Sequence, residues 1–89
     1  MDVVWTEYLK HRAALRGFDL DRIEQIVKSS SERYMDTATD RRIAVGRCGK
    51  TVVLIPYEAS GDRVTPITVH TITRRQIALR VKVGRFVHE

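Results

Sequence analysis

The spacing of apolar and polar residues changes near residue 32, and this change predicts an α+β fold. Before it, apolar residues recur at helical spacing, and after it, short segments alternate as strands do. Residues 3–5 are expected to form a short strand. Thr6 and Asp19 suit the N-cap positions of two helices, and Gly17 can end the first of them. We therefore predict an N-terminal helix hairpin with a tight turn.

The two helices are expected to bury different amounts of apolar surface. The first has only a narrow apolar stripe, formed by Tyr8, Leu9 and Ala13. The second has a broader apolar face that should pack on the core, and Phe18 can pack on Ile23 as a hydrophobic staple. The apolar positions of the second helix are Leu20, Ile23, Ile26 and Val27.

After residue 32, the pattern predicts an antiparallel meander with short polar turns. The expected strands are residues 33–36, 41–48, 51–57 and 63–72. In the last strand, Ile67 and Val69 should share one face, and His70 should lie on the other. Pro66 lacks a backbone N–H, so this strand either starts at a sheet edge or carries a bulge there.

The C-terminal residues 77–83 fit two patterns. Thr73 and Gln76 form a capping box and Gly84 suits a helix end, which favours a helix. Residues 79–83 also alternate as a strand would. The prediction is an N-terminal helix hairpin packed on a four-stranded antiparallel sheet, or a five-stranded one, followed by a basic C-terminal helix.

Composition adds that the 89 residues form a single domain, residues 1–89. Cys48 is the only cysteine, which excludes disulfides and suits a reducing compartment. The histidines show no metal-ligand spacing, so no metal and no cofactor is expected. The longest apolar run, residues 52–56, is too short to span a membrane, and no signal peptide is visible. We therefore expect a cytoplasmic protein.

The charge is distributed unevenly along the chain. Residues 1–40 carry six Lys or Arg and eight Asp or Glu, whereas residues 41–89 carry ten and three. Five cations and no acid lie between Arg74 and Arg85. Such a basic region attracts polyanions, and we expect RNA as the partner. The alternative is a solvated surface that only confers solubility.

Histidine and arginine are the residue types that RNA cleavage without a metal requires, because protons must move and a phosphorane carries negative charge. The candidate catalytic residues are His70, Arg47 and Arg74. The candidate RNA-binding residues are Arg41, Arg42, Arg75, Arg80, Lys82, Arg85 and Tyr57. His70 could instead be hydrogen-bonded within the sheet, and Tyr57 could belong to the core.

Three stretches resemble the RelE/ParE toxin superfamily of bacterial toxin–antitoxin systems, and its BrnT-like branch in particular. Val4-Trp5-Thr6 resembles the opening strand of these toxins. Lys10-His11, followed by Arg16-Gly17-Phe18, resembles their helix hairpin. Residues 67–75 resemble the BrnT-like passage from the last strand into a helix. The departures are His70 in place of arginine, Gln76 in place of glutamate, and Arg80 near a tyrosine position.

This resemblance implies a toxin that cleaves mRNA, often on the ribosome, and that a small acidic antitoxin neutralises. ParE-like relatives inhibit DNA gyrase instead. We therefore keep three hypotheses: a metal-independent endoribonuclease, a non-catalytic module that binds nucleic acid or an antitoxin, and a gyrase-directed inhibitor. A free sheet edge near Pro66 would also allow a homo-oligomer.

Overall fold

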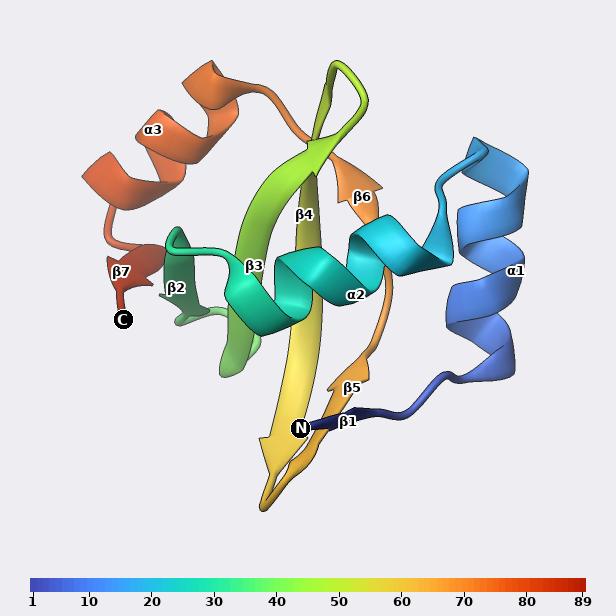
Figure 1. Cartoon of the computed structure of the whole chain (residues 1–89). Coiled ribbons are helices and arrows are strands. Elements are labelled where there is room, and N and C mark those ends of the chain that lie inside the picture. Colours follow the sequence, from blue (N-terminus) through green and yellow to red (C-terminus); the bar gives the residue numbers. More distant parts are fainter.

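The computed structural model describes residues 1–89 as one sheet with helices on both faces (Figure 1). The helices are α1 (Glu7–Arg16), α2 (Leu20–Ser29) and α3 (Arg74–Lys82). The strands are β1 (Asp2–Val3), β2 (Arg33–Asp36), β3 (Arg41–Cys48), β4 (Thr51–Ser60), β5 (Arg63–Pro66), β6 (His70–Thr71) and β7 (Phe86–His88). The predicted α+β class is confirmed.

The sheet has seven strands in the order β1-β5-β4-β3-β2-β7, with β6 pairing with β4 beyond the end of β5. Only the β1–β5 pair is parallel. The strand count is therefore higher than the four or five predicted. Strand β7 escaped prediction because three residues are too few to show alternation, and its partner β2 is distant in sequence.

The predicted helix boundaries are confirmed by their caps. The Leu9 amide donates to Thr6 Oγ1 at 3.1 Å, and the Asp21 amide donates to Asp19 Oδ1 at 2.9 Å. Gly17 takes a left-handed conformation with φ 71°, which favours glycine. At the C-terminus the complete capping box at Thr73 starts α3, so residues 77–82 are helical. No helix has the length and apolar character that crossing a membrane requires.

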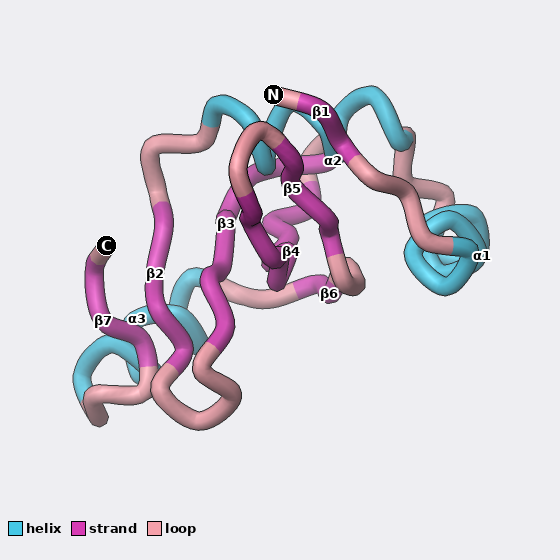
Figure 2. Tube along the Cα trace, turned by 90° about the horizontal axis from the view of Figure 1, so that it is seen from below, coloured by secondary structure: helices cyan, strands magenta, loops and turns pink.

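Each face of the sheet has its own hydrophobic cluster, and Figure 2 shows α2 and α3 on opposite sides. The first cluster joins α1 and α2 to the sheet, and its buried members include Leu9, Ala13, Ile23, Ile26, Val27, Ala44, Val53, Ile55 and Val69. The second lies under α3 and consists of Tyr34, Ile43, Val45, Leu54, Ile72, Ile77 and Phe86. Because α3 is short, it covers only part of its face.

The chain from 63 to 72 forms two short strands instead of the single predicted strand. Tyr57 pairs with Pro66, but Leu54 pairs with His70, so three residues of one strand lie opposite two of the other. This shift by one residue is a β-bulge, one of the two outcomes predicted for Pro66. A one-residue shift sends the following side chains to the opposite face.

The bulge overturns the prediction that Ile67 and Val69 share a face. Val69 is fully buried in the α1–α2 cluster, whereas Ile67 lines a cavity on the α3 face together with His70. His70 thus lies on the other face of the sheet from Val69, as predicted, but on the same face as Ile67. On the outer side of β5, β1 pairs with Arg63 and Val64 but not with Pro66, so the edge is only partly covered.

Candidate functional site

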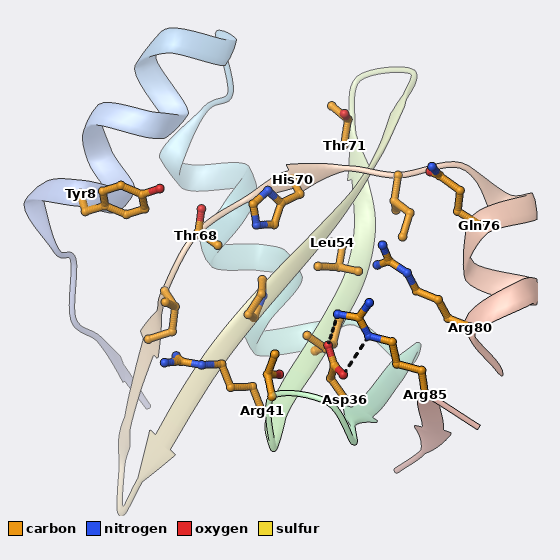
Figure 3. Close-up of a pocket in the computed structure, with 15 residues that line it drawn as sticks. Tyr8, Asp36, Arg41, Leu54, Thr68, His70, Thr71, Gln76, Arg80 and Arg85 are labelled. Carbon is orange, nitrogen blue, oxygen red and sulfur yellow. Dashed lines mark hydrogen bonds and ion pairs between the residues drawn. The ribbon is translucent and has the colours of Figure 1, made fainter. Parts of the chain in front are cut away.

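The uncovered part of the α3 face forms a cavity of about 630 Å³ (Figure 3). Its floor includes Leu54 and Pro56 of β4. Tyr8 of α1 lies on one side and Gln76 of α3 on the other, as Figure 3 shows. The cavity therefore draws residues from segments that are widely separated in the sequence.

Four of the predicted site residues line this cavity: Arg41, His70, Arg80 and Arg85. They come from β3, β6, α3 and the segment before β7. We call this site the basic cavity. Its only acidic lining residue is Asp36. Three arginines and one acid make it a place where an anion is attracted.

The other predicted residues of β3 lie outside the basic cavity. Arg42 is on the opposite face, where it pairs with Glu89 at 3.6 Å. Arg47 is on the same face as Arg41, but it is not among the residues that line the cavity. Its predicted role beside His70 stays a prediction.

The remaining predicted residues are also outside it. Arg74 forms an ion pair with Glu32 at 2.6 Å, and Arg75 and Lys82 are exposed elsewhere on α3. Tyr57 is only 5% exposed, and its hydroxyl accepts a hydrogen bond from Arg33 at 3.0 Å. Its ring is therefore part of the core, as in the alternative stated for it, and cannot stack on a base in this conformation.

Arg85 is held in place by a buried carboxylate. Its Nε and Nη2 donate to the two carboxylate oxygens of Asp36, each at 3.2 Å, and Asp36 is 4% exposed. Burial acts to raise the pKa of Asp36, but hydrogen bonds from Arg85 and the Ala38 amide, with the Arg85 charge, bring the pKa below its ordinary value of 3.8. Asp36 therefore stays ionised and fixes one wall of the cavity.

We predict that Asp36→Asn lowers the free energy of unfolding at neutral pH by about 1–2 kcal/mol, since Arg85 is partly exposed and the ion pair is screened. A carboxyl group with a lowered pKa in the folded state stabilises above its unfolded pKa, and this contribution is lost as pH falls. The difference between the wild-type protein and the Asn variant should therefore shrink below pH 3.8. Urea unfolding at several pH values measures it, and a difference independent of pH would contradict the prediction.

Arg80 is the arginine of the cavity that has no acidic partner. Its guanidinium carbon lies 5.4 Å from the centroid of the Phe86 ring, and it forms no ion pair. Figure 3 shows the side chain reaching from α3 toward the floor of the cavity near Leu54. A guanidinium placed by an aromatic ring, with its donors uncommitted, is suited to bind phosphate.

His70 is held by an arginine from α1. Arg12 Nη2 lies 3.0 Å from His70 Nδ1, and Arg12 Nε donates to the Val69 carbonyl at 3.2 Å. Partial burial, together with the charges of Arg12, Arg16 and Arg80, lowers the pKa of His70 below its ordinary value of 6.5. The imidazole of His70 is therefore neutral at neutral pH.

Tyr8, which lines the cavity, and Arg12, which contacts His70, were not predicted as site residues. Tyr8 was assigned to the apolar stripe of α1, but it is 60% exposed and lines the cavity, whereas Leu9 and Ala13 are buried. Arg12 gave no signal beyond being one of twelve arginines. Tyrosine carries a polar hydroxyl on an apolar ring, which suits the border between core and solvent. This was the only indication in the sequence that Tyr8 lies at such a border.

Comparison with protein-family models, curated proteins and solved structures finds no match for this chain. The resemblance to RelE/BrnT-like toxins thus stays a prediction from short motifs. A function has to be inferred from the chemistry of the basic cavity.

Proposed function

We propose that this chain is a cytoplasmic, toxin-like protein that binds RNA in the basic cavity and cleaves it without a metal ion. The observation that carries the proposal is the gathering of His70, Arg41, Arg80 and Arg85 around one cavity. These residues lie on four different elements, so no short sequence motif forces them together. Neutral histidine and uncommitted arginine are the groups that phosphodiester cleavage requires.

The shape and lining of the cavity support single-stranded RNA as the ligand. A volume of about 630 Å³ is within the range of small-molecule sites, so one nucleotide can enter. The exposed ring of Tyr8 is positioned to stack on a base. Thr71 and the side chain of Gln76 add groups that can bond to base edges.

In the proposed reaction, the substrate's own 2′-hydroxyl is the nucleophile. His70 takes the proton from this hydroxyl, and the oxygen then forms a bond to phosphorus while the bond to the 5′-oxygen breaks. Arg80 stabilises the negative charge on the phosphorane. The 5′-oxygen leaves with a proton from the medium, and the products are a 2′,3′-cyclic phosphate and a 5′-hydroxyl.

The contact between Arg12 and His70 favours a second candidate function, RNA binding without cleavage. Because arginine can only donate, His70 Nδ1 must accept in this contact, and its lone pair is occupied. A histidine held permanently in this way would offer only its Nε2–H, which can bind phosphate but cannot remove a proton. The two candidates therefore differ in whether Arg12 leaves the ring.

A small acidic antitoxin is the protein partner that we propose. Carboxylates would enter the basic cavity and exclude RNA from it. Leu79 of α3 and Val83, the C-cap of this helix, are 57% and 67% exposed. Both flank the basic residues Arg75 and Lys82, so an acidic segment with apolar residues would match this surface.

The test is primer extension on mRNA during induced expression of the wild-type chain, His70→Ala and His11→Ala. Cleavage is expected with the wild type, because ribosomes and mRNA are both present in the cell. Loss of a proton-transfer group should reduce the cleavage rate by about 10²-fold or more in His70→Ala. His11 is exposed on α1 and does not line the cavity, so His11→Ala is the matched control.

The result that would contradict the ribonuclease proposal is an absence of cleavage by the soluble, folded wild-type chain. In that case, binding of a fluorescent RNA that depends on cavity residues would establish the non-catalytic candidate. Equal cleavage by His70→Ala and wild type would show that the reaction occurs elsewhere on the protein.

A further inference from the structure

The bridge that Arg12 forms between α1 and β6 is the feature of the site that separates the two candidate functions. Arg12 makes two contacts across it, one with the Val69 carbonyl and one with His70 Nδ1. Val69 and His70 lie 57 and 58 positions after Arg12 in the sequence. Val69 is fully buried, so the carbonyl that anchors Arg12 belongs to a rigid part of the fold. Arg12 is therefore fixed beside the ring.

This geometry determines the protonation state of the imidazole. All hydrogen-bonding groups of arginine are donors, so Nδ1 of His70 carries no hydrogen in this contact. The single hydrogen of the neutral ring is then on Nε2. The only lone pair with which His70 could accept a proton is the one that Arg12 covers.

The charges around His70 also disfavour protonation of the ring. Partial burial is the largest cause of its lowered pKa, and the positive charges of Arg12, Arg16 and Arg80 lower the pKa further. Tyr8 and Gln76, on the two sides of the cavity, are uncharged. The only acid in the cavity, Asp36, is paired with Arg85. A phosphate would be the first negative charge to reach the ring.

We propose that Arg12 is a positioning residue that fixes the tautomer of His70 in the free protein and releases Nδ1 when a phosphate enters the cavity. The physical reason is competition for the guanidinium. The neutral ring offers Arg12 only a lone pair, whereas a phosphate adds direct attraction between opposite charges, so the phosphate attracts Arg12 more strongly than the ring does. The inference depends on the proposed function in one respect only, namely that the phosphate of bound RNA would free His70 to act as a base.

The experiment is NMR of the ring nitrogens in the ¹⁵N-labelled chain, which reports the tautomer and the pKa of His70 without any cleavage. In the wild type, the Nε2–H tautomer is expected to predominate. Arg12→Met removes both the donor and the charge, so the tautomers should mix and the pKa should rise. Arg12→Lys retains a cation that can only donate, so both the tautomer and the lowered pKa should persist.

Arg16→Gln is the matched control, because it removes a nearby charge without touching Nδ1. Its tautomer should equal that of the wild type, with a smaller rise in pKa. Inorganic phosphate added to the wild type should raise the pKa of His70 and move the Nδ1 signal toward its position in Arg12→Met. Backbone amide dispersion checks that every variant is folded.

Two results would overturn the inference. Mixed tautomers in the wild type, unchanged by Arg12→Met, would show that Arg12 does not position the ring. Phosphate that binds without changing the His70 signals would show that it does not release Nδ1. If the NMR results are as expected and the chain still does not cleave RNA, the ribonuclease proposal fails while the role of Arg12 stands. If RNA is cleaved, Arg12→Met should shift the acidic limb of the pH–rate profile to higher pH.

Discussion

Gly46→Val is expected to lower the free energy of unfolding by about 3 kcal/mol or more. A Cβ atom on Gly46 would lie 2.6 Å from Ile26 Cγ1 and 2.9 Å from Ile26 Cδ1 and Cγ2. These are side-chain atoms of a residue that is 2% exposed, so Ile26 cannot move into solvent. Overpacking typically costs about 1–3 kcal/mol and sometimes more, and valine adds two methyl groups beyond Cβ. A domain of this size has about 5–10 kcal/mol of stability, so the variant should stay folded but unfold at a much lower urea concentration.

The cause of this loss can be isolated with smaller changes. Gly46→Ala should cost about 1–3 kcal/mol, and Ile26→Ala about 2–5 kcal/mol, because it leaves a cavity. In the double variant, the new methyl group occupies the space that Ile26 vacates. The double variant should therefore lose less stability than the two single losses together, by about 1 kcal/mol or more. Urea unfolding measures all four proteins, and additive losses would show that the close approach of α2 to β3 is not the cause.

Arg80→Glu is expected to weaken RNA binding at least about tenfold, which corresponds to about 1.4 kcal/mol. Arg80 is the cavity arginine without an acidic partner, so its donors are free for phosphate. The matched control is Arg75→Glu, on the same helix but outside the cavity. Each change lowers the formal net charge of +5 by two, so the long-range attraction is weakened equally.

The measurement is binding of a fluorescent 2′-O-methyl oligonucleotide, which cannot be cleaved by its own 2′-oxygen. For Arg80→Glu, the slope of log affinity against log salt should also fall by about 0.7 or more, as for loss of a phosphate contact on a single strand. Arg75→Glu should weaken binding only about twofold, because an exposed charge outside the cavity is screened. Equal losses for the two variants would show that RNA is held by net charge and not by the basic cavity. Thermal unfolding of Arg80→Glu measures whether loss of the contact with Phe86 destabilises the fold.

The arginines of the basic region differ in ways that the sequence does not reveal. By sequence, Arg47 and Arg74 were candidate catalytic residues, and Arg41 and Arg80 were candidate RNA-binding residues. In the structure, Arg47 does not line the cavity, Arg74 is paired with Glu32, and Arg80 lines the cavity without an acidic partner. Nothing local distinguishes them, because the difference lies in partners contributed by other elements. Arg33 is a further example, since it donates to the Ser30 and Val27 carbonyls and supports the end of α2.

What the sequence determined by itself is the local structure. The caps at Thr6, Asp19 and Thr73 set the starts of all three helices, and β2 and β3 have the predicted bounds. These features depend on residues within a few positions of one another, so their signals are contained in short windows. His70 was identified in the same way, by its residue type and its place before a basic helix.

What only the tertiary structure decided is the site. The bulge before His70 shifts the register by one residue, and that shift selects which side chains share the cavity. The contact of Arg12 with His70 spans 58 residues, and that of Arg85 with Asp36 spans 49. Such contacts form only when the sheet is assembled, because hydrogen bonding between distant groups depends on their positions in space and leaves no periodic trace in the sequence.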